Sequence, residues 1–212
     1  MSLRIDIHVH TRLHSPCSRI EPEALIRQAA KIGLDGLVIT EHQYQWSPHD
    51  VAALVERSGA RNFLVLTGFE YTSLQGDLLI YGLSVPQAGQ FRPGLTPEEA
   101  VHMAHDMGGI CVAAHPTRAT MGFDERIATL ALDAIEIRSM NLQEHEQRLA
   151  ATLAAAINVL PVAASDAHDL AHVGRYVTEF DDPIQTMADL HESFRRGRFR
   201  PGDNAPTRMM PL

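Results

Sequence analysis

Residues 4–9, RIDIHV, and residues 36–40, GLVIT, are the two stretches that decide the fold. The first alternates apolar and polar residues and the second is almost wholly apolar, so each predicts a β-strand. Between them, residues 21–32 carry apolar residues at helical spacing, with Pro22 suited to the first helical position and Gly33 to the position after the last turn. The chain therefore begins as a strand, a helix and a second strand.

The same alternation continues along the chain. Further strands are predicted at residues 63–69, 78–83, 110–114, 134–137, 159–164 and 176–180. Helices are predicted at residues 48–57, 97–107, 124–130, 142–156 and 184–195. This repeat predicts an α/β fold with a mainly parallel sheet, either closed as a barrel or open and doubly wound, with functional residues at the carboxyl ends of the strands.

Two segments depart from the alternation. Residues 86–97 are rich in Pro, Gly and Gln, which favours an exposed loop or short linker. From Gly197 onward the chain is rich in Arg, Pro and Met, which favours a frayed tail. We therefore expect one domain over residues 1–196, followed by a C-terminal tail over residues 197–212.

Composition limits the classes of function. The 212 residues are 45% hydrophobic and 21% charged, as in an ordinary globular enzyme. The 18 Lys and Arg set against 26 Asp and Glu give a formal net charge of −8, and 12 histidines stand out. Nucleic acid is an unfavourable partner for so acidic a chain, because binding phosphates needs concentrated cations, although a local basic pocket stays open.

Three features bear on the compartment. Residues 1–10 contain Asp6 and two histidines where a signal peptide needs an apolar core. The longest apolar stretch, residues 149–164, is interrupted by polar residues and is shorter than the roughly 20 residues of a membrane-spanning helix. Two cysteines, Cys17 and Cys111, make no disulfide framework. We expect a cytoplasmic protein with no membrane partner.

Histidines and carboxylates gather where the predicted strands end. His8 and His10, separated by one residue, project to the same face at the end of the first strand, a spacing that suits a shared metal. The others follow the second, third, fifth and seventh strands: Glu41, His42, Glu70, His115, Asp166 and His168. Burying such groups together is costly unless they are paired or bind a cation. A metal is the simplest compensation.

The donor types indicate which metal to expect. Mixed imidazole and carboxylate donors favour zinc, manganese or iron over magnesium or calcium. Seven strong candidates, the set above without Glu41, exceed the three or four ligands of one catalytic site, so more than one metal is expected. Adjacent metals can hold a bridging hydroxide and clamp a phosphate, which suits hydrolysis of a phosphoester. Five other histidines lie on predicted helices and are interpreted as surface residues: His49, His102, His105, His145 and His191.

Five motifs in a fixed order carry a family resemblance. They are Asp6-Ile-His-Val-His-Thr11, Ile39-Thr-Glu-His42, Gly68-Phe-Glu70, Ala114-His-Pro116 and Ser165-Asp-Ala-His168. Together they resemble the polymerase and histidinol phosphatase (PHP) family of metal-dependent phosphoesterases over about residues 3 to 180. The resemblance implies a distorted, TIM-like (β/α)7 barrel with two or three divalent metal ions at its C-terminal rim, and hydrolysis of phosphomonoesters or phosphodiesters.

The resemblance also implies roles for single residues. Ligands of the first metal would be His8, His10, Glu70 and Asp166. The second metal would take His42 and His168, and the third His115 and Glu70, with Glu70 bridging. His14 would supply a further ligand to the second metal unless it is only a loop residue. Asp77 stands where many relatives carry a histidine ligand of the third metal, unless it is only a turn residue.

One motif departs from the family pattern, which usually reads Thr-Asp-His. Here Thr40-Glu41-His42 keeps the carboxylate with one more methylene, so the assignment of His42 stands. Phosphate recognition also needs cations near the rim, and Arg118 is the first candidate because it lies three residues after His115. Further candidates on rim loops are Arg138 and Arg175, together with Arg12 and Arg19. A surface ion pair is the alternative role for each.

The leading hypothesis is a hydrolase in which a metal-bridging water attacks the phosphorus of a small phosphorylated substrate. A 3′ to 5′ exonuclease is a second hypothesis, against which the net charge of −8 and the single tryptophan argue. A third is a metal-stabilised regulatory domain without turnover. The motifs leave open the substrate, the general acid and the oligomeric state, and the short chain predicts a fairly open pocket.

Overall fold

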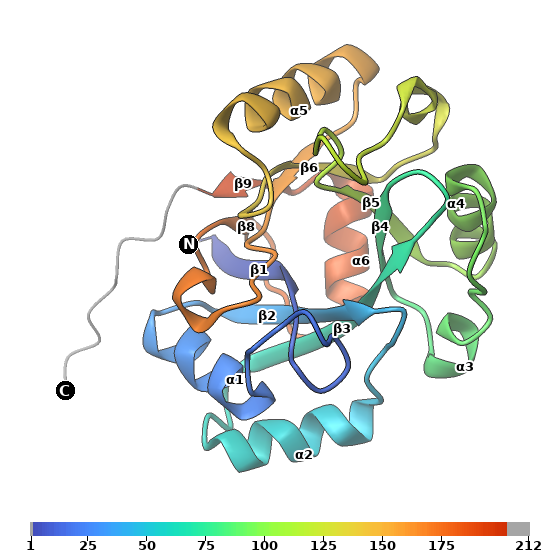
Figure 1. Ribbon diagram of the computed structural model, residues 1–212. Coiled ribbons are helices and arrows are strands. Elements are labelled where there is room, and N and C mark those ends of the chain that lie inside the picture. The colour runs from blue at the N-terminus through green and yellow to red at the C-terminus, as the bar shows by residue number, and fades with distance from the viewer. Residues whose placement is uncertain (1, 203–212) are drawn as a thin grey trace.

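The sheet curls into a nearly closed barrel (Figure 1). The computed structural model describes residues 2–202. Its strands are β1 Leu3–Val9, β2 Gly36–His42, β3 Leu64–Thr72, β4 Asp77–Tyr81, β5 Ile110–Ala114, β6 Ala134–Arg138, β7 Pro161–Ala163, β8 Val177–Phe180 and β9 Phe199–Gly202. Their order in the sheet is β7-β6-β5-β4-β3-β2-β1-β8-β9. The barrel closes where β8 approaches β7. There the Thr178 hydroxyl accepts a hydrogen bond from the Ala163 N–H and donates one to the Ala163 carbonyl. The expected barrel, rather than an open sheet, is what the chain forms.

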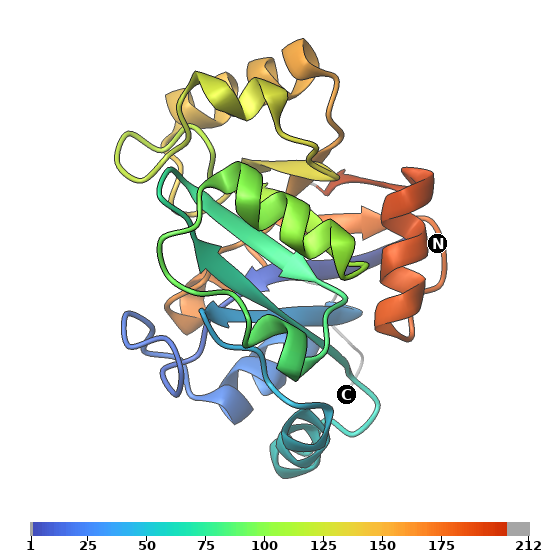
Figure 2. The same cartoon turned by 90° about the vertical axis from the view of Figure 1, so that its right-hand side faces the viewer.

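The helices lie outside the sheet, apart from α6 at one end (Figure 2). They are α1 Pro22–Lys31, α2 Pro48–Ser58, α3 Val85–Ala88, α4 Pro97–Asp106, α5 Glu144–Ile157 and α6 Met187–Arg196, with 3-10 turns η1 Glu125–Thr129 and η2 Leu170–His172. Sequence signals explain the starts, since Ser47 accepts a hydrogen bond from the Asp50 N–H and Thr96 forms a capping box with Glu99. No helix within residues 2–202 combines the length and apolar character that crossing a bilayer requires.

The directions of β4, β8 and β9 correct the prediction of a mainly parallel sheet, since β8 is antiparallel to β1 and β9 is antiparallel to β8. The neighbours β1, β2 and β3 are parallel, as are β5, β6 and β7, but β4 is antiparallel to both of its neighbours. The turn at residues 73–76 is too short for a helical crossover, and Gly76 takes a φ of 89° there. Consequently β4 begins, rather than ends, at the rim where its neighbours end, with Asp77 opposite Thr72 and Ala114.

Three predicted segments differ from the observed structure. Residues 199–202 are not a tail but strand β9, which pairs with β8 and buries Phe199 in the core. The rest of the predicted tail, residues 203–212, lies outside the described residues. Helix α3 occupies the start of the expected loop at residues 86–97, and the helix predicted at residues 124–130 is the 3-10 turn η1.

The apolar core fills the end of the barrel that lies away from the metal-ligand candidates. Ile5 and Ile7 of β1 pack there with Tyr81, whose hydroxyl donates to the Ile7 carbonyl at 2.8 Å. Leu190 and Phe194 of α6 belong to the same cluster and close that end (Figure 2). Burial of these side chains stabilises the barrel by roughly 1.5–3 kcal/mol for each large residue. The opposite rim is therefore free to carry polar groups.

Candidate metal centre

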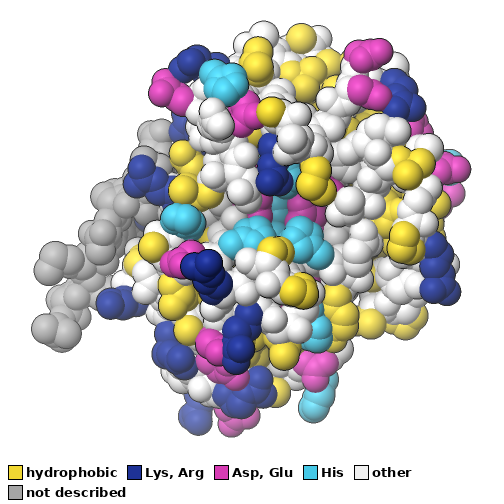
Figure 3. Space-filling model, in the orientation of Figure 1, with side chains coloured by type: hydrophobic (Ala, Val, Ile, Leu, Met, Phe, Trp, Pro, Cys, Tyr) yellow, Lys and Arg dark blue, Asp and Glu magenta, His cyan; other side chains and the backbone are white. Residues whose placement is uncertain are grey.

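The carboxyl ends of the strands surround a cavity of about 820 Å³. Figure 3 looks onto this rim and shows histidines and acidic side chains at the bottom of a central hollow. The lining includes His42, Glu70, Asp77, His115, Asp166 and His168. A larger cavity of about 1160 Å³ lies between α2 and β3, but no described group of potential metal donors lines it. The rim cavity is therefore the candidate site.

The four ligands predicted for a first metal lie together. The Nε2 atoms of His8 and His10 are 3.0 Å apart. Asp166 Oδ1 lies 3.3 Å from His8 Nε2 and 3.1 Å from His10 Nε2, and Glu70 Oε2 lies 3.5 and 3.2 Å from the same atoms. Donor atoms that share a metal at 2.0–2.2 Å are about 3–3.5 Å apart. The spacing is therefore that of ligands around one ion.

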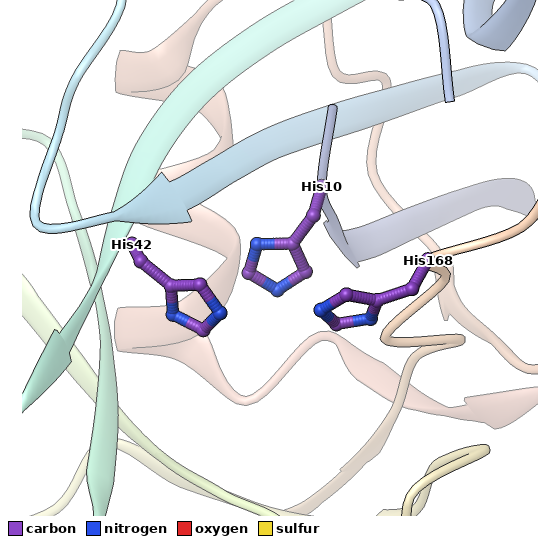
Figure 4. A group of neighbouring side chains, drawn as sticks. All are labelled: His10, His42 and His168. Atoms are coloured by element: carbon purple, nitrogen blue, oxygen red, sulfur yellow. The ribbon is translucent and has the colours of Figure 1, made fainter. Parts of the chain in front are cut away.

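A second group unites three imidazoles, His10, His42 and His168, which point toward one another (Figure 4). The His10 ring lies 4.5 Å from the ring of His42 and 4.5 Å from that of His168. His42 Nδ1 also lies 2.9 Å from Glu70 Oε2, the oxygen that faces the first group. The two groups are thus contiguous.

His14 does not join this group. Its ring stacks on Tyr44 at 3.7 Å and meets the edge of Trp46 at 4.9 Å. No described group of potential metal donors contains it. The loop after β1 directs His14 into an aromatic contact, so the structure does not bring it to the donors of the second group.

Glu70, Asp77 and His115 form the group predicted for a third metal. Glu70 Oε1 lies 3.0 Å from His115 Nε2, and Asp77 Oδ2 lies 3.9 Å from the same nitrogen. Because β4 runs antiparallel, its first residue reaches the rim, and Asp77 is 3% exposed. Glu70 therefore faces this group with one oxygen and the other two groups with its second, as a bridging carboxylate would.

Two residues of the site have strained backbones. His115 has a φ of 28° and Asp166 a φ of 49°, in the left-handed region that residues other than glycine rarely adopt. The His115 N–H donates to Glu136 Oε2 at 2.7 Å, and the Asp166 N–H donates to the His8 carbonyl at 2.8 Å. These bonds hold both turns so that the side chains face the cavity floor.

Glu136, in the middle of β6, is a functional residue that the sequence reasoning missed. It is fully buried, and its Oε1 lies 3.1 Å from His8 Nδ1. A carboxylate in this position accepts the Nδ1 proton and leaves Nε2 free to face the donor cluster. The signal was present, since a glutamate stands inside the predicted strand 134–137, where apolar residues were expected.

Two further polar residues support the cluster. Asn141, after β6, donates a hydrogen bond to Asp166 Oδ2. Glu41, beside His42, turns away from the donors and accepts hydrogen bonds from the Ser15 hydroxyl at 2.6 Å and the Trp46 indole at 3.0 Å. Glu41 therefore stabilises the loop after β1 rather than adding a donor to the cluster.

The electrostatics of the cluster fit bound cations. Burial opposes charge on His8, but Asp166, Glu70 and Glu136 outweigh it and raise the His8 pKa well above its ordinary value. Burial likewise opposes charge on Glu70, and the facing histidines hold its pKa well below the usual range. Glu70 Oε2, Asp77 Oδ1 and Asp166 Oδ1 are buried without a hydrogen-bond donor, which is rare unless an ion is accommodated. The residues therefore fit a group of divalent metals.

Two arginines reach the cavity wall. Arg118 and Arg19 line it, whereas Arg138 and Arg175, also predicted to bind phosphate, are not among its lining residues. Arg12 instead pairs with Glu21 at 2.5 Å. The Arg118 loop is held by α5, because the Ala119 N–H donates to Glu146 Oε1 at 2.7 Å.

Sequence comparisons give two matches. The profile of a family described as PHP-associated matches residues 144–199. An uncharacterized protein of Methanocaldococcus jannaschii, MJ1587, is 27% identical over 145 residues, which cover 64% of this chain and 81% of that protein.

Solved structures share the fold along most of the chain. PsfC from Pseudomonas syringae PB-5123 has a TM-score of 0.73 at 19% identity, and the matched region covers 96% of this chain and 92% of PsfC. A protein from Bifidobacterium adolescentis described as a metal-dependent phosphoesterase has a TM-score of 0.64 at 17% identity. The matched region covers 91% of this chain and 96% of that protein. The lesion-specific endonuclease PfuEndoQ from Pyrococcus furiosus has a TM-score of 0.68 at 16% identity. The matched region covers 95% of this chain and 58% of PfuEndoQ. The five ordered motifs and the PHP-associated match over residues 144–199 make the chain similar to proteins of the PHP family, and its fold is the one that these solved structures share.

Proposed function

We propose that this protein hydrolyses a small phosphate ester at the rim cavity, with two or three divalent metal ions as cofactors. The observation that carries the proposal is the placement of Glu70, whose two carboxylate oxygens face adjacent donor groups. Such a bridging carboxylate is typical of sites that hold neighbouring metals. The distances between the groups support a cluster rather than isolated ions.

The donor groups support a proposal for the ligands of each metal. The first would be held by His8, His10, Glu70 and Asp166, the second by His42 and His168 with Glu70 Oε2 beside them, and the third by Glu70, Asp77 and His115. Mixed imidazole and carboxylate donors favour zinc, manganese or iron. Divalent ions there would supply water activation and neutralise negative charge on the phosphate.

Other side chains of the protein would bind the phosphate and orient the metal ligands. Arg118 and Arg19 stand at the cavity wall, where guanidinium groups can take phosphate oxygens in a bidentate contact. Glu136 fixes the orientation of His8 through Nδ1, and Asn141 fixes Asp166 through Oδ2. These contacts hold the donors in place before substrate arrives, which reduces the reorganisation that binding requires.

A nucleic-acid phosphodiesterase is the second candidate, favoured by the fold shared with PfuEndoQ. The net charge of −8 weighs against it, because single-stranded nucleic acid binds along grooves rich in cations and aromatic side chains. Turnover of a mononucleotide and of an oligonucleotide, measured under the same conditions, separates the two. We expect the mononucleotide to be the better substrate.

The proposal is tested with metal-stripped protein reloaded with manganese or zinc and assayed on a panel of phosphate esters. We expect activity only after reloading, and loss of at least about 1,000-fold in Glu70→Gln, which removes the bridging charge. The matched control is Glu144→Gln, whose side chain is 89% exposed on α5 and should leave activity unchanged. A metal-loaded protein that is stabilised by metal but turns over no phosphate ester would support the regulatory-domain alternative instead.

A further inference from the structure

The wall of the rim cavity that faces solvent contains apolar side chains. Met121 and Met140 line the cavity, together with Ala171. They come from the loops after β5, β6 and β7, which are neighbours in the sheet and so form one side of the rim. Figure 3 shows hydrophobic side chains at the border of the hollow. We name Met121, Met140 and Ala171 the apolar wall.

Met121 lies at this wall with an exposed apolar side chain and an unfavourable backbone conformation. Its side chain is 56% exposed, although it is apolar, and its φ of 66° lies in the left-handed region that favours glycine or asparagine. The next residue, Gly122, cannot be replaced easily, since an added Cβ would lie 2.4 Å from the Arg118 carbonyl oxygen. The tight turn therefore presents Met121 to the cavity on the same loop that carries Arg118.

The cavity thus has two chemically different parts. The donor cluster, Arg118 and Arg19 suit a phosphate group. Asn141, Asp169 and His172 also line the cavity and can hydrogen-bond hydroxyls, whereas the side chains of Met121, Met140 and Ala171 offer a hydroxyl group no such partner. Two methionines make an adaptable apolar surface, and thioether sulfur makes favourable contacts with the edges of aromatic rings.

We propose that the apolar wall binds the part of the substrate that lies beyond the phosphate, so that the enzyme selects phosphate esters of alcohols bearing an aromatic ring over sugar phosphates. This inference rests on the proposed phosphoesterase function. Hydrolysis itself is unchanged: water adds to phosphorus, the phosphorus–oxygen bond to the alcohol breaks, and the alcohol oxygen takes up a proton. Met121 and Met140 act by binding the leaving alcohol.

The test compares benzyl phosphate with glucose 6-phosphate, which are both monoesters of primary alcohols. With manganese-loaded protein we expect kcat/KM for benzyl phosphate to exceed that for glucose 6-phosphate by at least about tenfold. Met121→Asn keeps a residue that tolerates the left-handed backbone but removes the apolar contact. It should raise KM for benzyl phosphate about tenfold with kcat within twofold, whereas Met121→Leu should retain most of the selectivity.

The control is Leu149→Ser, which removes an equally exposed apolar side chain, 55% exposed, from α5. It should leave both substrates unaffected, and circular dichroism should show every variant folded. Equal turnover of the two substrates, or selectivity that survives Met121→Asn and Met140→Ser, overturns the inference but leaves the proposed function standing. Absence of turnover of any phosphate ester by the metal-loaded wild type overturns both.

Discussion

Glu136 Oε1 lies 3.1 Å from His8 Nδ1, and both side chains are fully buried. The other oxygen of Glu136 accepts the backbone N–H of His115 at 2.7 Å. One carboxylate therefore orients a residue of the first donor group and a residue of the third. The geometry of the cluster depends on a strand interior as well as on the strand ends.

Glu136→Gln should weaken metal binding. The amide can accept the His8 Nδ1 proton or the His115 N–H with its single oxygen, but its NH₂ group then faces the other donor. Loss of such a supporting contact typically lowers metal affinity by about 10- to 100-fold. Calorimetric titration of the metal-free variant with Mn²⁺ checks this. Affinity equal to that of the wild type would show that Glu136 has no role in orienting the ligands.

Asp77→Asn should remove one metal equivalent and leave the others. Asp77 belongs to the third donor group but to neither of the first two, whereas Glu70 reaches them all. Metal content per chain, measured by plasma mass spectrometry after reloading, should fall by about one. The control is Asp106→Asn, whose side chain is 65% exposed on α4. Unchanged metal content in Asp77→Asn would mean that Asp77 is only a turn residue.

The pH dependence of metal binding follows from His115. Burial opposes its charge, but the hydrogen bond and charge of Glu70 outweigh it and raise the His115 pKa from 6.5 to about 9 in the metal-free protein. Protonated His115 thus stabilises the metal-free fold below pH 6.5, and this stabilisation is lost as pH rises through about 9. A metal must displace the same proton, so its own stabilising effect grows with pH over that range.

Thermal unfolding with and without Mn²⁺ measures this trend. The increase in Tm on adding metal should be larger at pH 8 than at pH 6. An increase that is constant, or larger at pH 6, would contradict proton displacement from the cluster.

Arg118→Ala should impair phosphate binding. Arg118 lines the cavity on a loop that α5 holds through Glu146. Loss of a charged hydrogen-bonding partner should raise KM by roughly 10- to 100-fold, and Arg118→Lys should restore only part of the effect because lysine lacks the planar fork. Steady-state kinetics on one good substrate checks both. Arg61→Ala, at the separate cavity beside β3, is the control. An unchanged KM in Arg118→Ala would exclude phosphate recognition by this residue.

Local patterns predicted most of the barrel and the position of the cluster. Helix caps such as Thr96 with Glu99, and the short apolar strands, depend on neighbouring residues and so can be predicted from the sequence. The strand-end rule then placed His8, His115 and Asp166 on one rim. The direction of β4 could not be predicted in the same way, because it depends on how the turn at residues 73–76 closes.

The features that were missed depend on contacts between distant segments. Strand β9 exists because it pairs with β8 and buries Phe199, which the Arg- and Pro-rich composition around it concealed. His14 was assigned by its place in the loop after the first motif, but stacking on Tyr44 determines its position. Glu136 lies inside a strand, so a rule based on strand ends does not find it, although a buried charge inside a strand is itself informative.

Calorimetric titration of metal-free protein with Mn²⁺ or Zn²⁺ tests the metal centre most directly. Wild type should bind two or three equivalents, and Asp166→Asn, which removes a charge from the first donor group, should bind fewer and more weakly. Absence of binding by folded wild-type protein, or the same binding by Asp166→Asn, would contradict the assignment of the rim cluster as a metal centre.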